Sequence, residues 1–106
     1  MFHSFAVNPA QLSVATPLSA TPLPFTSASI QSQYISGGAP VRIVARQADG
    51  TFPITGGVVL APGVGGNPGG DLAQLFAGAP YPHDFNQLAL IITHTGDGVD
   101  ILYVKV

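Results

Sequence analysis

Short apolar stretches, some alternating and some continuous, are separated by glycine and proline through most of the chain after residue 27. Stretches of this kind are typical of β-strands bounded by turns. The pattern predicts strands over residues 28–35, 40–48, 51–54, 58–60, 87–93 and 99–106. Asp49-Gly50 is typical of a hairpin turn because both residue types tolerate positive φ, and Pro53 places the strand that follows at a sheet edge.

The last two predicted strands carry apolar residues on both faces, which favours the middle of a sheet. Thr95-Gly96-Asp97-Gly98 is a turn sequence between them. We therefore expect residues 87–93 and 99–106 to form an antiparallel hairpin. Together with the other short strands, this predicts an all-β fold, a small antiparallel β-sandwich or barrel.

One short helix is expected over residues 72–77, with Asp71 as its N-cap and Gly78 and Pro80 ending it. A long glycine-rich loop over residues 61–70 precedes this helix. A Walker phosphate loop needs Lys and then Ser or Thr after its last glycine, whereas Asp71 follows here. The loop is therefore predicted to be a flexible or interface segment, not a phosphate site.

Residues 1–26 are predicted to form an extended arm, and residues 27–106 the β-domain. The arm holds a tandem repeat, ATPLS followed by ATPLP, whose prolines exclude a helix and favour polyproline or edge-strand backbone. An extended chain cannot cover its own apolar side chains, so we expect these to bind a partner or the arm's own domain. The arm residues predicted to do so are Phe2, Phe5, Val7, Leu12, Val14, Leu18, Leu23 and Phe25.

Charged side chains make up only 8% of the 106 residues, against about 25% in ordinary soluble domains. A surface so poor in charge suits burial against neighbouring subunits, which predicts a homo-oligomer or a larger assembly. Three Lys and Arg side chains are too few for nucleic-acid binding. No stretch is apolar enough to span a bilayer or to act as a signal peptide, so we expect synthesis in a cytoplasm and no membrane partner.

Arg42 and Arg46 share one face of the strand predicted over 40–48. They are candidates for a salt bridge, either to a neighbouring subunit or across a sheet to Asp100. The alternative is two solvated charges that contribute little.

The candidates for catalysis and metal binding are weak. Asp97 and Asp100 could offer carboxylate oxygens to calcium, with His94 close by in sequence, but the carboxylates lie in and beside a turn where Asp is common for backbone reasons. Asp71 and Asp84 could face each other as glycosidase carboxylates, although each has a simpler capping or loop role. The chain has no Cys and no Gly-x-Ser-x-Gly motif. We therefore expect no catalytic residue, cofactor or metal, and regard a small barrel enzyme as the least favoured alternative.

The Pro/Thr/Ala-rich arm, the small Gly-rich β-domain and the closing sequence IITHTGDGVDILYV together resemble the small virion proteins of tailed bacteriophages, and capsid decoration proteins among them. The resemblance implies a non-enzymatic protein that clusters at capsid symmetry axes and grips the major capsid protein with its arm. It also implies localisation in the virion, after synthesis in the host cytoplasm.

Two alternatives to capsid decoration stay open at this point. The Gly-rich loop and helix over residues 61–78 depart from the decoration-protein pattern, which leaves a tail or neck component possible. A receptor- or glycan-binding module of the virion is the other alternative, although the chain has no Trp and only three Tyr for a sugar platform.

Overall fold

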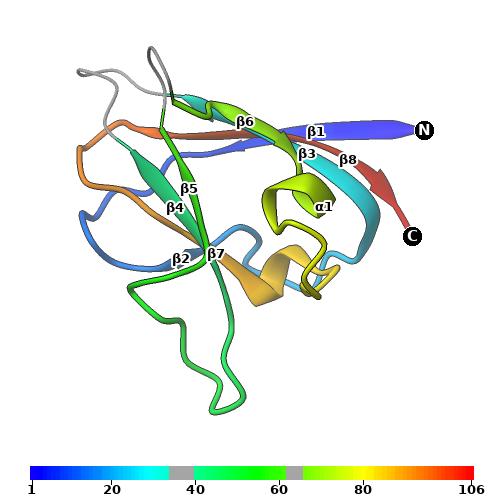
Figure 1. Ribbon diagram of the computed structural model, residues 1–106, viewed down its shortest axis with the longest axis horizontal. Coiled ribbons are helices and arrows are strands. Elements are labelled where there is room, and N and C mark those ends of the chain that lie inside the picture. Colours follow the sequence, from blue (N-terminus) through cyan, green and yellow to red (C-terminus); the bar gives the residue numbers. More distant parts are fainter. Residues whose placement is uncertain (34–39, 62–65) are drawn as a thin grey trace.

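A computed structural model describes residues 1–33, 40–61 and 66–106 of the chain, and the fold is two antiparallel sheets packed face to face (Figure 1). Sheet A has the strand order β1-β8-β3-β6, with β1 at Phe2–Val7, β8 at Gly98–Lys105, β3 at Phe25–Gln33 and β6 at Gly69–Asp71. Sheet B has the order β2-β7-β4-β5, with β2 at Thr16–Pro17, β7 at Leu88–Ile91, β4 at Val41–Ala45 and β5 at Val58–Leu60. This confirms the predicted all-β, sandwich-like class.

The core lies between the sheets because the strands of each sheet turn alternate residues inward. Fully buried aliphatic side chains from both sheets meet there, including Ile30 and Ile101 from sheet A and Ile43 and Leu90 from sheet B. An aromatic cluster closes one end of the core. It is centred on Phe85, which lies in the short 3-10 helix η1 (Phe85–Gln87). The Phe85 ring stacks on the Phe25 ring, with 4.2 Å between the ring centroids.

The predicted helix is present but shorter than expected, with α1 spanning Leu72–Leu75. Asp71 is its N-cap as predicted, and its side chain accepts a hydrogen bond from the amide of Ala73. Gly78 follows the helix with φ of +80°, the left-handed conformation that suits a glycine after a helix. The helix therefore begins where the sequence indicates but ends two residues early, one turn after it begins.

The first 26 residues include two extended strands, β1 and β2, with a turn at Leu12 and Ser13 between them, and they are built into the domain and are not a separate arm. β1 pairs with β8 along its whole length, from Phe2 opposite Val104 to Val7 opposite Val99, and β2 pairs with β7. Leu18 is buried in the core. The radius of gyration, 12.7 Å, is that of one compact domain of this length, about 13 Å. The boundary predicted at residues 26 and 27 therefore falls inside a single folded unit.

The predicted hairpin of residues 87–93 and 99–106 is wrong. Both segments contain strands, and each strand is central as expected, but β7 lies in sheet B between β2 and β4, whereas β8 lies in sheet A between β1 and β3. The intervening residues carry the chain from one sheet to the other, with Gly96 at a φ of +93° and Ile92 buried in the core. Apolar residues on both faces indicate a central strand, but they do not say which strand lies beside it.

The strand predicted over residues 51–54 is also wrong. The chain between β4 and β5 is an irregular loop (Figure 1), held at its tip by a hydrogen bond from the amide of Gln47 to the carbonyl of Thr51. Phe52 folds back from this loop onto Val44, on the outer side of sheet B. Burial of Phe52 therefore replaces strand pairing in this segment. Residues 34 and 35 of the strand predicted over 28–35, and residues 62–65 of the glycine-rich loop, lie outside the described residues.

Candidate docking face

The outer side of sheet A is an open surface formed by the residues that β1, β8 and β3 turn away from the core. Ser4, Leu102 and Ser29 lie side by side on neighbouring strands, and all three are exposed. Asp71 of β6 continues the same row beyond Ser29. We call this surface the sheet A face; it consists of Phe2, Ser4, Ala6, Ser27, Ser29, Gln31, Gly69, Asp71, Asp100 and Leu102.

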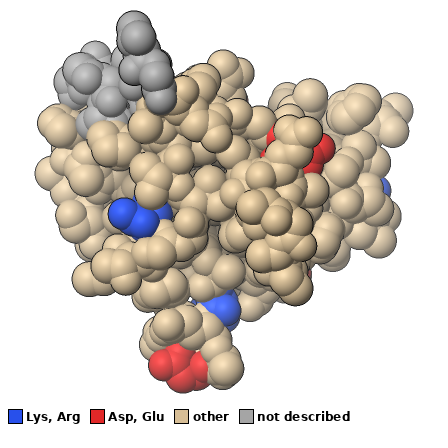
Figure 2. All heavy atoms as spheres, in the orientation of Figure 1, with Lys and Arg blue, Asp and Glu red and all other residues tan. Residues whose placement is uncertain are grey.

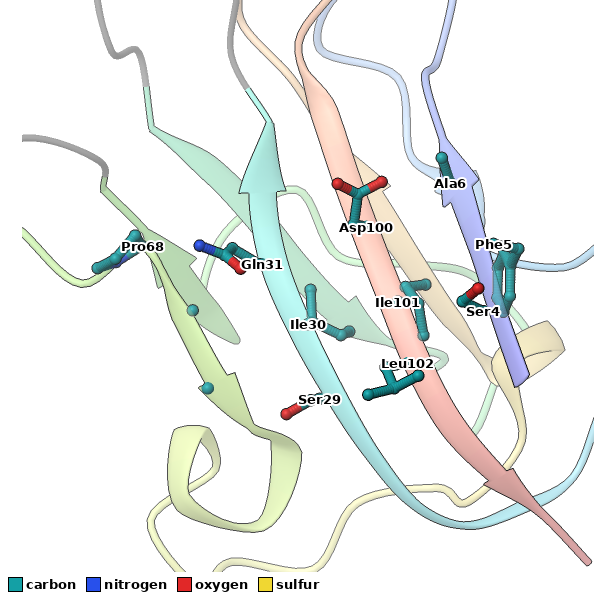
Figure 3. A pocket seen from close by; sticks show the side chains of 12 residues that line it. Ser4, Phe5, Ala6, Ser29, Ile30, Gln31, Pro68, Asp100, Ile101 and Leu102 are labelled. Carbon is teal, nitrogen blue, oxygen red and sulfur yellow. The ribbon is translucent and has the colours of Figure 1, made fainter. Parts of the chain in front are cut away.

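A hollow of about 710 Å³ crosses this face from β1 to β6 (Figure 3). Its outer lining is made of small side chains on three of the four strands, with Ser4 and Ala6 on β1, Ser29 on β3 and two glycines on β6. A Cβ atom at Gly69 would lie 2.2 Å from the carbonyl oxygen of Ile30, so only glycine allows β6 to approach β3 this closely. The hollow exists because β1, β3 and β6 carry little side-chain volume outward at these positions.

The polar groups of the hollow are mostly neutral. Its described lining contains a single carboxylate, that of Asp100, and no basic side chain. Asp100 accepts a hydrogen bond from the side-chain amide of Gln33. Ser4, Ser29 and Gln31 add two hydroxyls and an amide. The free energy needed to dehydrate a surface of this kind is small, because few charged groups lose their water when a partner covers it.

Apolar side chains border the hollow on one side. Phe2 is 67% exposed and Leu102 is 46% exposed. Together with Ser27, Ala28, Ser29 and Asp71 they line a second, smaller hollow of about 90 Å³, which shares Ser29 and Leu102 with the first. The sheet A face therefore combines exposed apolar groups with adjoining recesses, which is the composition expected of a protein contact surface.

The structure separates the arm residues predicted to bind a partner into two groups. Phe2, Leu12 and Val14 are exposed. The others face the protein itself: Leu18 and Phe25 are buried in the core, and Phe5, Val7 and Leu23 pack against it. Of the exposed three, only Phe2 belongs to the sheet A face. The predicted arm residues thus contribute mainly to folding.

Arg42 and Arg46 hold the loop between β4 and β5. The guanidinium of Arg42 donates to the carbonyl of Gly56 at 2.6 Å, and that of Arg46 donates to the carbonyl of Gly50 at 2.7 Å. The Arg46 guanidinium also lies 4.4 Å from the centre of the Phe52 ring, a cation–π contact. In the described part of the chain neither arginine bonds to Asp100, which lies on the other sheet.

The acidic residues considered for catalysis have structural roles. Asp71 caps α1, and Asp84 caps η1, with its Oδ1 accepting hydrogen bonds from the amides of Leu23 at 3.0 Å and Asn86 at 2.8 Å. Asp97 is fully buried, whereas Asp100 is exposed on the sheet A face. Within residues 1–33, 40–61 and 66–106, no group of three His or acidic side chains is arranged to hold a metal ion.

Two of the three histidines, His3 and His83, contact aromatic rings. His3 lies 5.3 Å from the Tyr103 ring, and His83 lies 4.4 Å from the Tyr81 ring.

No helix in the described residues is both long enough and apolar enough to cross a bilayer.

Sequence reasoning missed most of the sheet A face. In the sequence, Asp100 and Leu102 alternate with Ile101 and Tyr103. This alternation could have placed Asp100 and Leu102 on the same side of a strand. That this side faces outward follows only from the pairing of β8 with β1 and β3.

In comparisons with known proteins, no family model, curated protein or solved structure gave a significant match. The function is therefore argued from the sequence and structure of the chain. The charge distribution therefore carries most of the functional argument. Figure 2 shows one side of the molecule with only isolated Lys, Arg and Asp side chains on an otherwise uncharged surface.

Proposed function

We propose that this chain is a non-enzymatic virion structural protein, most specifically a capsid decoration protein that docks through its sheet A face and bridges neighbouring subunits of the major capsid protein. The observation that carries the proposal is the composition of that face. It combines a hollow lined mainly by small, neutral groups with the exposed side chains of Phe2 and Leu102, and it carries two carboxylates, those of Asp71 and Asp100, on a protein with only 8% charged residues.

The proposed mechanism is mechanical. Each copy adds buried apolar area between shell subunits, and burial contributes about 25 cal/mol per Å² of apolar surface removed from water. A standard interface buries about 1,600 Å² in total. In a decorated shell this contribution recurs at every copy, so a modest affinity per copy can still stabilise a whole particle through many contacts.

The roles of the polar side chains support a non-enzymatic function. The two carboxylates considered for acid–base chemistry, those of Asp71 and Asp84, accept backbone amide hydrogen bonds at helix caps. This capping role explains the position of both side chains without a catalytic one.

A receptor- or glycan-binding module of the virion is the second candidate. The feature that favours it is the main hollow, where the carboxylate of Asp100 and the amide of Gln31 lie beside serine hydroxyls. Groups of this kind can bind sugar hydroxyls. The hollow offers no aromatic platform, however, because the ring of Phe5 packs inward against Phe85 and Tyr103, and Phe2 lines only the smaller recess.

The proposal is tested by co-sedimentation of the purified protein with undecorated shells. Leu102→Asp places a charge in the middle of the docking face, and we expect it to weaken shell binding by about tenfold or more, because a carboxylate is costly to bury without a partner. The matched control is Val59→Asp on β5. Val59 is 41% exposed, close to the 46% of Leu102, but it lies on sheet B.

Val59→Asp should leave shell binding within about twofold of the unsubstituted protein. Equal effects of the two substitutions would refute docking through the sheet A face. Binding to tail or neck assemblies but not to shells would replace decoration with a tail function. Retention on immobilised glycans without particle binding would favour the second candidate.

A further inference from the structure

The two sheets have four edge strands, and β1 differs from the other three. β2 is two residues long and includes Pro17, while β5 and β6 are three residues each, and Pro68 precedes β6. Short strands and prolines are common devices that keep sheet edges from pairing with other chains. The described residues therefore protect three of the four edges.

β1 has none of these protections. It pairs with β8 over six consecutive residues without a bulge, and it contains neither proline nor an Asp, Glu, Lys or Arg. Figure 3 shows it as the outermost strand of sheet A, on the side away from β6. A long, regular and uncharged edge presents unpaired backbone groups that another strand can bind.

We propose that β1 pairs with β1 of a second copy of this chain, antiparallel about a two-fold axis centred on Ser4, so that two sheets A become one eight-stranded sheet. This deepens the proposed function by naming the chain itself as the partner at the edge of the docking face. It does not require shell binding, because self-association is measured on the isolated protein.

The side chains of β1 explain why a second copy fits. A two-fold axis perpendicular to the sheet keeps both outer faces on the same side, which requires residues of the same orientation to lie opposite each other. Centred on Ser4, the axis places Ser4 opposite Ser4 and Phe2 opposite Ala6. Phe2 is the large exposed residue of the strand, and Ala6 is a small residue that lines the hollow at the sheet edge.

The two-fold axis therefore places the Phe2 ring of each copy beside the small side chain of Ala6 of the other copy. On the inner side the axis places His3 opposite Phe5, and both of these are half-buried. Moving the centre to Phe5 would leave Phe2 outside the paired segment, which disfavours that register. A single strand edge buries less than a standard interface, so we expect a dissociation constant on the order of 10–100 µM.

Sedimentation velocity over a concentration series tests the pairing, using Ser4→Lys with Ser29→Lys as the matched control. Ser29 lies in the same row of sheet A as Ser4, is also exposed, and is separated from β1 by β8. The unsubstituted protein and Ser29→Lys should both shift from the 10.8 kDa monomer to a dimer as concentration rises. Ser4→Lys should remain monomeric, because two ammonium groups would meet at the axis.

An equimolar mixture of Ser4→Lys and Ser4→Glu should associate again, since opposite charges then meet at the axis. This rescue separates loss of pairing from loss of folding. Monomeric unsubstituted protein at about ten times the expected dissociation constant would overturn the proposal. So would equal association of the Ser4→Lys and Ser29→Lys variants, or a mixture that stays monomeric.

The register is tested by cysteine cross-linking, which is clean because the chain has no native Cys. Residues directly opposite each other in an antiparallel pair have Cβ atoms about 4.5–5.5 Å apart, close to the span of a disulfide. Ser4→Cys should therefore form a covalent dimer under mild oxidation, and Ser29→Cys should not. Equal cross-linking of the two variants would refute a two-fold axis at Ser4.

Discussion

Phe85→Ala is expected to cost more stability than any other truncation of an aromatic side chain in the aromatic cluster. Phe85 is completely buried, and its ring contacts three others, with centroid distances of 4.2 Å to Phe25, 5.2 Å to Tyr103 and 5.3 Å to Phe5. These partners belong to β3, β8 and β1, so the substitution weakens three of the four strands of sheet A where they pack against η1.

The magnitude follows from burial and from ring contacts. Truncation of a buried Phe to Ala costs about 3–5 kcal/mol through lost transfer energy and the cavity left behind. Aromatic pairs contribute a further 0.5–1.5 kcal/mol or so each beyond their buried area, which places Phe85→Ala near the upper end, at about 4–5 kcal/mol. At about 4 °C or more per kcal/mol for a domain of this size, the melting temperature should fall by at least roughly 15–20 °C.

The assay is urea unfolding of dilute protein followed by far-ultraviolet circular dichroism, with Phe2→Ala as the control. Phe2 is the same residue type but 67% exposed, so its truncation should change the free energy of unfolding by about 0.5 kcal/mol or less. A loss below about 1.5 kcal/mol for Phe85→Ala, or equal losses for the two variants, would refute the position given to Phe85 at the centre of the core.

Three further substitutions test individual contacts. Asp84→Ala should destabilise the fold by about 1–3 kcal/mol, because two half-buried amides lose their acceptor, and Asp84→Asn should recover part of this in the same melt. Gly57→Ala should cost more than Gly50→Ala: both have positive φ, but only at Gly57 would a Cβ atom meet a backbone oxygen, 2.2 Å away, and equal melting temperatures would contradict this. Burial, and secondarily Asp71, raises the pKa of Tyr81 above its ordinary value of 10.0. The stabilisation that comes from keeping the Tyr81 hydroxyl protonated is therefore complete below pH 10.0, and it is lost as pH rises through the raised pKa of the folded protein. Tyr81→Phe should remove this loss and flatten the pH dependence of the free energy of unfolding in that range.

Local features of the fold were predictable because they depend on neighbouring residues. The cap at Asp71 and the strand over β4 follow from short-range backbone preferences and from alternation. Sheet membership was not predictable. A turn sequence such as Thr95-Gly96-Asp97-Gly98 suits a hairpin and a crossover between sheets equally well, and only the pairing of β8 with β1 and β3 decides between them.

The same difficulty affected the N-terminal segment and the candidate docking face. The described residues 1–26 contain no helix, as the proline spacing indicated, and are extended only in part, but an extended segment can form an arm or an edge strand, and pairing with β8 decides this. The docking face requires knowing which side of β8 faces the core. Leu102 and Tyr103 are adjacent in sequence, yet the first is 46% exposed and the second 8%.

The central claim is that this chain is a component of virus particles, and the most direct measurement is quantitative mass spectrometry of particles purified on a density gradient. We predict that peptides of the chain co-purify with intact shells at a fixed ratio to the major capsid protein, and that this ratio falls when Leu102→Asp replaces the unsubstituted protein. Particles that lack the chain, while it is abundant in the particle-free fraction of the same cells, would contradict the proposed function.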